Sequence, residues 1–167
     1  RLAFGDVRAA VVVQEMIESE ASGVLFTRNP QTGAAEHVVN AAWGLGEGVV
    51  ADRVVADTYF VDRRSGEIRR EVARKDARVV FDRERGSGTR IEPLPDELRE
   101  RAVLDDATIC EIAALGERIE TRAGGAPQDV EWAALGGRVY VLQARPITAM
   151  ATRPARDADP VTVFDNS

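Results

Sequence analysis

The sequence predicts an α+β fold in which a mostly antiparallel sheet packs against helices. Most of the chain consists of short runs rich in β-branched residues and separated by glycine, proline and polar turns, which is typical of strands joined in hairpins. One stretch, from Asp105 or Asp106 to about Arg122, instead repeats apolar residues at spacings of three and four, as an amphipathic helix does. With 167 residues, 44% of them hydrophobic, the chain can form one globular domain with its own core.

The first two thirds of the chain read as strands and turns. In order, we expect strands at 11–16, 23–27 and 36–42, with a turn at 29–33 between the second and third; a hairpin of strands 57–62 and 67–73 around a turn at 63–66; a loop at 83–89; and one or two helical turns at 96–101. The glycine-rich stretch 44–48 lacks the lysine of a phosphate-binding P-loop, so it predicts a sharp strand-to-helix turn.

The helical segment carries its own start and stop signals. Asp105 or Asp106 can cap its first turn, and Gly124 and Gly125 end it, with Pro127 preventing a restart. Residues 149–167 contain two prolines, several aspartates and few large apolar side chains, which predicts a linker or disordered tail. We therefore divide the chain into a domain at 1–148 and a tail at 149–167.

Two alternating runs at 128–134 and 140–146 predict an antiparallel hairpin through Gly136 and Gly137. A two-residue loop would place Val130 opposite Gln143. A three-residue loop that includes Arg138 places Glu131 opposite Gln143, and we prefer this register. It puts Val130, Trp132 and Ala134 on an apolar face with Tyr140, Leu142 and Ala144.

In this register the other face of the hairpin gathers Asp129, Glu131, Gln143 and Arg145. A carboxylate beside an amide oxygen suits Mg²⁺, which usually keeps some waters and shares the phosphates of its substrate. An adjacent arginine suits a phosphate. The alternative is an exposed strand face on which Glu131 and Arg145 are solvated charges or a surface ion pair of little energetic value.

A resemblance favours the first alternative. Residues 128–132 followed by 141–148 resemble the end of the ATP-grasp nucleotide-binding domain of the phosphoenolpyruvate synthase and pyruvate phosphate dikinase family. Three further segments resemble this family in the same order, at 11–17, 21–30 and 42–50. The resemblance covers about residues 10–148, and four ordered blocks are more specific than a single motif.

The resemblance implies the C-terminal subdomain of an ATP-grasp fold and a role for each site residue. Gln14 would lie beside the adenine, Glu131 and Gln143 would hold Mg²⁺ against the phosphates of ATP, and Arg145 would bind phosphate and act catalytically by neutralising charge on the transferring group. Glu47 lies in a block that flanks the nucleotide cleft, but the resemblance assigns it no role.

The implied parent enzyme is a phosphoenolpyruvate synthase-like dikinase. In this family ATP is cleaved to AMP, and its β-phosphate passes to a histidine on a separate domain and then to pyruvate. We expect the chain to need two partners of that parent, an N-terminal ATP-grasp subdomain and the phosphohistidine domain, and to turn nothing over alone. The alternatives are the ATP-binding portion of a rifampin phosphotransferase and a non-catalytic nucleotide-binding or interaction module.

Several single residues carry weaker signals. His37 lacks the glycine-rich context of a phosphorylated histidine, so we expect an ordinary strand residue. Cys110 is expected to be a small buried hydrophobe. For Arg74 and Lys75, a solvated basic pair and a pair that reaches phosphate both remain open.

The composition sets limits on partners and location. A net charge of −6 argues against a nucleic-acid-binding surface, where a basic patch is expected. A single cysteine agrees with a reducing compartment, and the sequence contains no signal peptide and no apolar run of about 18 residues. We expect a soluble cytoplasmic protein that does not associate with membranes.

Overall fold

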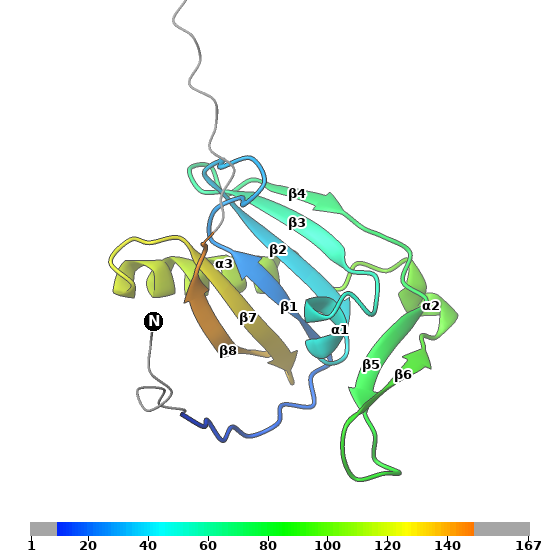
Figure 1. Ribbon diagram of the computed structural model, residues 1–167. Helices are drawn as coiled ribbons and strands as arrows, with labels where there is room; N and C mark the ends of the chain where they lie inside the picture. The colour runs from blue at the N-terminus through cyan, green and yellow to red at the C-terminus, as the bar shows by residue number, and fades with distance from the viewer. Residues whose placement is uncertain (1–9, 149–167) are drawn as a thin grey trace, which may run out of the picture.

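The computed structural model describes residues 10–148, which form a six-stranded antiparallel sheet with one long helix against one face (Figure 1). The sheet order is β4-β3-β2-β1-β7-β8, so the two C-terminal strands lie beside the first. Its strands are β1 (Ala21–Phe26), β2 (Glu36–Trp43), β3 (Asp57–Asp62), β4 (Ile68–Glu71), β7 (Gln128–Leu135) and β8 (Arg138–Pro146). The expected α+β class with a mostly antiparallel sheet is confirmed, while the tail predicted at 149–167 lies outside the described residues.

The core lies between the sheet and α3 (Asp106–Arg122). Of the two predicted capping residues, Asp105 and Asp106, it is Asp105 that caps this helix. Its carboxylate accepts a hydrogen bond of 2.8 Å from the Thr108 amide. Ile109 and Ile112 from the predicted stripe are at most 1% exposed and pack with Leu25, Val39, Tyr59, Val130 and Trp132 of the sheet. None of the helices among residues 10–148 is both long enough and apolar enough to cross a membrane.

Trp132 can lie in this core because its partner on β1 is a glycine. Gly23 is directly opposite Trp132, and a Cβ at Gly23 would stand 3.0 Å from the indole ring and 1.8 Å from the Asn40 carbonyl oxygen. Along β7 the buried residues Val130 and Trp132 alternate with Asp129 and Glu131. The acidic side chains therefore project from the sheet face opposite α3.

The β7–β8 hairpin corrects the predicted turn and confirms the predicted pairing of Glu131 with Gln143. Leu135 pairs with Arg138, so the loop has two residues, Gly136 and Gly137, and not three. A bulge between Glu131 and Trp132 then adds Leu142 to β8 and shifts the register by one residue, which puts Glu131 opposite Gln143.

The bulge also corrects the membership of the apolar face. Val139 pairs with Ala134 and packs against the core, whereas Tyr140 pairs with Ala133 on the other face. Ala144 is exposed opposite Val130. The sequence could not show this exchange, because one extra residue in a strand reverses the facing of every position before it.

The strand predicted at 11–16 is wrong. This segment forms no β-ladder with the described residues, and Val11, Val12 and Val13 are 88%, 85% and 95% exposed. High β-propensity produces a strand only where a neighbouring strand supplies hydrogen bonds and packing. Within residues 10–148, no such neighbour pairs with these valines.

A second hairpin was missed around the predicted loop at 83–89. β5 (Ala77–Phe81) and β6 (Thr89–Pro93) form a separate two-stranded ribbon that extends away from the large sheet (Figure 1). Gly44, at φ +86°, bridges to Val79 on β5, and the chain then turns into the short helix α1 (Glu47–Val50). The predicted strand-to-helix turn is thus confirmed, as is the short helical segment, α2 (Asp96–Arg99).

Lys75 is buried in a polar network with residues of β3 and does not line the candidate pocket described below. Its ammonium donates to Asp57 Oδ1 at 2.6 Å and to the Ala73 carbonyl oxygen at 2.7 Å, and both side chains of the ion pair are at most 1% exposed. The second oxygen of Asp57 accepts from the Tyr59 hydroxyl and from the Val103 amide. The network therefore joins β3, the segment after β4 and the segment before α3.

The neighbouring Arg74 is exposed and paired with Glu100, so the two basic residues have different environments. Cys110 is exposed on α3, which corrects the expectation of a buried residue.

His37 is a strand residue as expected, and its side chain is buried. Its Nε2 lies 3.4 Å from Glu117 Oε1, and its Nδ1 has no hydrogen-bond partner among the described residues. Burial lowers the pKa of His37, which the hydrogen bond to Glu117 opposes.

Replacing Lys75 tests the buried network. We expect Lys75→Met to lower the free energy of unfolding by about 3–5 kcal/mol, because it leaves the Asp57 carboxylate buried without its charge partner. Arg74→Met is the matched control and should cost less than about 1 kcal/mol, since its ion pair is exposed. Urea unfolding monitored by circular dichroism measures both; equal, small losses would contradict the role given to Lys75.

His37 should make the stability of the fold dependent on pH. Its folded-state pKa lies below the unfolded value of 6.5, so the unfolded chain binds more protons, and stability falls as the pH drops below about 6.5. Burial raises the pKa of Glu120, but hydrogen bonds from Thr27 and Arg63 and the charge of Arg63 lower it below its ordinary value, so Glu120 adds a loss of stability only at lower pH. Urea unfolding at a series of pH values should show a flatter dependence for His37→Leu than for the unchanged chain, and identical curves would contradict this.

Candidate functional site

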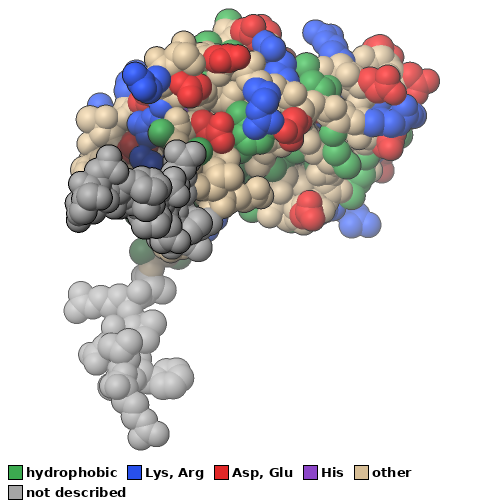
Figure 2. Space-filling model, turned by 90° about the horizontal axis from the view of Figure 1, so that it is seen from above, with side chains coloured by type: hydrophobic (Ala, Val, Ile, Leu, Met, Phe, Trp, Pro, Cys, Tyr) green, Lys and Arg blue, Asp and Glu red, His purple; other side chains and the backbone are tan. Residues whose placement is uncertain are grey.

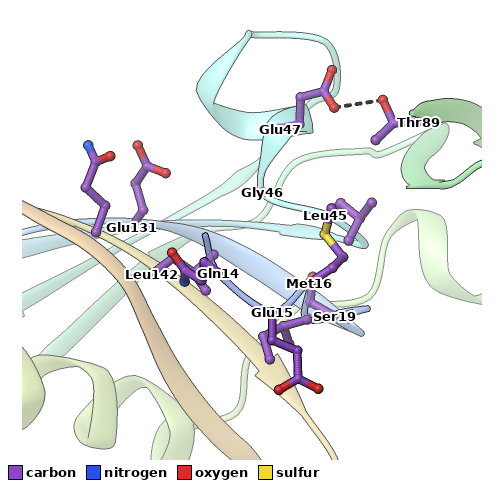
Figure 3. Close-up of a pocket in the computed structure, with 12 residues that line it drawn as sticks. Gln14, Glu15, Met16, Ser19, Leu45, Gly46, Glu47, Thr89, Glu131 and Leu142 are labelled. Atoms are coloured by element: carbon purple, nitrogen blue, oxygen red, sulfur yellow. Dashed lines mark hydrogen bonds between the residues drawn. The ribbon is translucent and has the colours of Figure 1, made fainter. Parts of the chain in front are cut away.

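A pocket of about 360 Å³ lies on the sheet face opposite α3, where β7 and β8 meet the segment before β1 and the turn into α1. Figure 3 shows its lining side chains, with Glu131 and Glu47 extending to the same side and Leu45 and Met16 close together. The apolar part of the lining comes from Met16, Ile17, Leu45 and Leu142. The pocket therefore combines an apolar surface with carboxylate and amide groups, as small-molecule sites do.

Glu131 and Gln143 sit side by side on this pocket because they are directly opposed across β7 and β8. Opposed residues of an antiparallel pair have their Cβ atoms about 4.5–5.5 Å apart, so both side chains can reach one ion. Leu142, the extra residue of the bulge, lines the same pocket. The bulge thus places an apolar side chain on β8 directly before Gln143, beside the polar pair of Glu131 and Gln143.

Arg145 and Asp129 form the next opposed pair on the same face of the two strands. Asp129 Oδ2 accepts from Arg145 Nε at 2.9 Å and lies 2.8 Å from Arg145 Nη2. The Asp129 side chain is 13% exposed and that of Arg145 is 63% exposed. A nearly buried carboxylate therefore holds the base of a guanidinium group whose outer part remains open to an anion.

Glu47, the first residue of α1, also lines the pocket. Its Oε1 accepts from Arg53 Nη1 at 2.5 Å and its Oε2 accepts from the Thr89 hydroxyl at 2.7 Å (Figure 3). Thr89 opens β6 and also lines the pocket. These contacts connect the β5–β6 ribbon to α1.

The turn that carries Glu47 is held by backbone and serine contacts. The Gly44 carbonyl oxygen accepts hydrogen bonds from the Ser22 hydroxyl at 2.6 Å and the Ser19 hydroxyl at 2.9 Å, and the Leu45 amide donates to the Val79 carbonyl oxygen at 2.8 Å. The position of Glu47 is therefore fixed by the same loop that was predicted from its glycines.

The oxygen donors of the pocket fit a magnesium ion that takes its remaining ligands from the phosphates of a substrate and from water. Glu131 supplies a carboxylate and Gln143 an amide oxygen, both hard donors. The described residues contain no group of three or more His, Cys, Asp and Glu side chains arranged to hold a metal. Two donors with open positions suit Mg²⁺ bound through substrate phosphates better than a cage formed by protein alone.

The structure brings most of the predicted site residues together. Glu131, Gln143 and Gln14 line one pocket, and Arg145 lies next to them on β8. Gln14 is exposed, and it lines the pocket from a segment that is not the predicted strand. Their roles toward ATP and Mg²⁺ stay predictions.

Other pocket residues were not singled out as site residues from the sequence. Leu142 was placed on the wrong face because the bulge has no clear sequence signal. Thr89 was assigned to a loop, although the alternation of residues 89–93 could have indicated a strand. Glu47 had the clearest signal, since it follows the glycine turn directly.

The chain is similar to several much longer proteins. It is 44% identical over 144 residues to a probable phosphoenolpyruvate synthase of Methanothermobacter thermautotrophicus, covering 86% of this chain and 21% of that protein. It is 42% identical over 152 residues to a phosphoenolpyruvate synthase of Pyrococcus furiosus, covering 86% of this chain and 18% of that protein. It is 39% identical over 160 residues to a rifampicin phosphotransferase of a Streptomyces species, covering 95% and 18%.

The chain thus spans about a fifth of the length of these relatives. The relatives named as phosphoenolpyruvate synthases confirm the resemblance carried by the four ordered sequence blocks. Residues 2–162, nearly the entire chain, match the family described as the pyruvate phosphate dikinase, AMP/ATP-binding domain, and the chain belongs to this family.

Proposed function

We propose that this chain is the ATP-binding portion of a phosphoenolpyruvate synthase-like phosphotransferase, and that residues 1–148 are the C-terminal part of its ATP-grasp domain. In that enzyme it holds Mg-ATP while a phosphoryl group passes to a histidine on a separate domain. The observation that carries this proposal is the pairing of Glu131 with Gln143 beside Arg145, on a pocket that also contains Gln14.

The geometry supports a division of labour between these side chains. Glu131 and Gln143 would hold Mg²⁺, which neutralises charge on the phosphates when it is bound. Arg145 is held by Asp129 through Nε and Nη2, which leaves Nη1 available for a phosphate oxygen. Phosphoryl transfer depends mainly on positioning and electrostatic stabilisation, so these groups supply what the protein must contribute.

The apolar part of the pocket supports binding of a base. Leu45, Met16 and Leu142 offer a surface on which a purine can pack, and Gln14 offers an amide beside it. The pocket volume of about 360 Å³ is in the range typical of small-molecule sites, about 300–1,000 Å³.

The phosphoryl acceptor is a separate question from nucleotide binding. Similarity to a rifampicin phosphotransferase over 95% of the chain favours an antibiotic as the second candidate acceptor. An enzyme assay of the full-length parent with pyruvate and with rifampicin discriminates the two. The site described on this chain is the same under either acceptor.

Removing either predicted metal ligand should weaken binding of Mg-ATP. We expect Glu131→Ala and Gln143→Ala each to raise the Kd by about tenfold or more, since a contact to a charged group is worth about 1.5–3 kcal/mol. Isothermal titration calorimetry with and without magnesium measures this. The effect should disappear in the absence of magnesium.

Glu71 provides a matched control for these variants. It is a carboxylate on the opposite edge strand, β4, and lies on the same sheet face as Glu131 through the paired residues Val24, Asn40 and Thr58. Glu71→Ala should leave the Kd unchanged. Retention of full binding by both site variants would overturn the metal assignment, and absence of binding by the unchanged chain would overturn the proposal that this chain binds nucleotide.

Arg145 should favour ATP over AMP, because it is proposed to contact the phosphates that AMP lacks. We expect Arg145→Ala to weaken ATP binding by about tenfold, because a guanidinium–phosphate contact is lost, and to change AMP binding much less. Asp129→Asn should have an intermediate effect, since it removes the charge that holds Arg145 in place. Competition titrations with ATP and AMP measure both, and equal loss for the two nucleotides would contradict a phosphate-reading role.

A further inference from the structure

We propose that a segment of this chain itself, residues 161–164, docks on the sheet face opposite α3, in a hollow between the β1–β2 turn and β3. The segment belongs to residues 149–167, which follow the described part of the chain. The inference does not rest on the proposed nucleotide site, because this hollow shares no lining residue with the pocket that contains Glu131.

An apolar strip crosses this face from β1 to β3. Phe26, Val38 and Phe60 are directly opposed on the three strands and project to the same side. Val38 is 7% exposed, whereas both phenylalanines are partly exposed. A hollow of about 200 Å³ lies over the strip, and the turn residues Pro30 and Gln31 also line it. Since α3 packs on the other face, an apolar surface remains open here.

Guanidinium groups flank the strip at both ends. Arg145 is paired with Asp129, the neighbour of the strip on β7. Arg69 on β4 is opposite Phe60, with its guanidinium carbon 3.7 Å from the centre of the phenylalanine ring. The Arg145 and Arg69 side chains are 63% and 57% exposed, and each contacts one carboxylate, which leaves other N–H donors free. The face therefore offers an apolar centre with a positive group at each end.

The tail carries the complementary pattern in its sequence. Residues 161–164 are two valines, a threonine and a phenylalanine, which are residue types that favour an extended backbone. Asp159 precedes this run and Asp165 follows it directly, so carboxylates bracket the apolar run as arginines bracket the apolar strip. Four extended residues are about 13 Å long, and the two strand spacings of the strip are about 10 Å.

The connection starts at the correct end of the sheet and is long enough. β8 ends at Pro146 and β1 ends at Phe26, both at the end of the sheet where the β1–β2 turn lies (Figure 1). Residues 149–160 can span at most about 40 Å, whereas β8 and β3 are four strand spacings, about 19 Å, apart. Figure 2 views this end of the molecule, where hydrophobic side chains are exposed between acidic and basic ones.

The direction of the docked segment follows from this connection. A chain that arrives from β8 reaches β1 before β3, so Asp159 lies towards Arg145 and Asp165 towards Arg69. Asn40 lines the same hollow and offers a side-chain amide to the backbone of the segment. Because the segment is tethered, docking is intramolecular at an effective concentration of the order of millimolar, and individually weak contacts suffice.

Paramagnetic relaxation measured by NMR on the full chain tests the docking. A nitroxide attached at Asn166→Cys, with Cys110→Ser to remove the exposed thiol on α3, reports the position of the tail. We expect the label to broaden the methyl signals of Val38 strongly and those of Val80 on the β5–β6 ribbon weakly, relative to the reduced label. Val163→Asp should remove most of the broadening at Val38, because a carboxylate is costly to bury in an apolar strip.

A charge-reversal cycle tests the direction of the segment. Arg69→Asp and Asp165→Arg should each lower the equilibrium constant for docking by up to about fivefold, the value of an exposed ion pair, and the double variant should recover it. Arg118→Asp, at an exposed arginine on α3, is the matched control and should leave the broadening unchanged.

The outcomes distinguish this contact from its alternatives. Equal broadening of Val38 and Val80, or broadening at Val38 that survives Val163→Asp, overturns docking of this segment. A double variant that stays as weak as the single ones overturns the pairing of Asp165 with Arg69. Broadening of isotope-labelled chains by separate nitroxide-labelled chains in a mixed sample assigns the face to a second copy and overturns the intramolecular contact.

Discussion

The register between β7 and β8 depends on one extra residue, Leu142, and the candidate site depends on that register. A two-residue turn alone would place Val130 opposite Gln143, which would put an apolar residue of the core beside the amide. The bulge moves β8 by one position, so that Glu131 meets Gln143 and Asp129 meets Arg145. Two polar pairs thus arise from one local irregularity.

The sheet can present these polar pairs because its other face carries the hydrophobic core. Trp132 packs over Gly23, and α3 covers the same face with Ile109 and Ile112. Since alternate residues of β7 face opposite ways, burial of Val130 and Trp132 against α3 places Asp129 and Glu131 on the opposite face of the sheet. The core and the candidate site are therefore two consequences of one alternating sequence, and a substitution that rotated β7 would damage both.

Local signals in the sequence predicted most elements and failed where partners far along the chain decide the outcome. The cap at Asp105, the glycine stop of α3 and the turn at Gly44 are local and were predicted correctly. The strand predicted at 11–16 was wrong because β-propensity does not reveal whether a pairing strand exists. The β5–β6 hairpin was missed because the sequence predicted only the charged, glycine-rich loop at its tip and not the strands on either side. The Glu131 and Gln143 pairing was correct although the predicted turn was not. The buried Lys75 could not be recognised, since its partner Asp57 is distant in sequence.

The small number of protein donors has a consequence for how the proposed site would work. Magnesium prefers six oxygen ligands in octahedral geometry and gives up water reluctantly. In the proposed site Glu131 and Gln143 would supply two of these, and the described residues contain no group of three or more His, Cys, Asp and Glu side chains that could hold a metal ion. Affinity for the metal would then come largely from the nucleotide phosphates, so metal and nucleotide would bind as one unit.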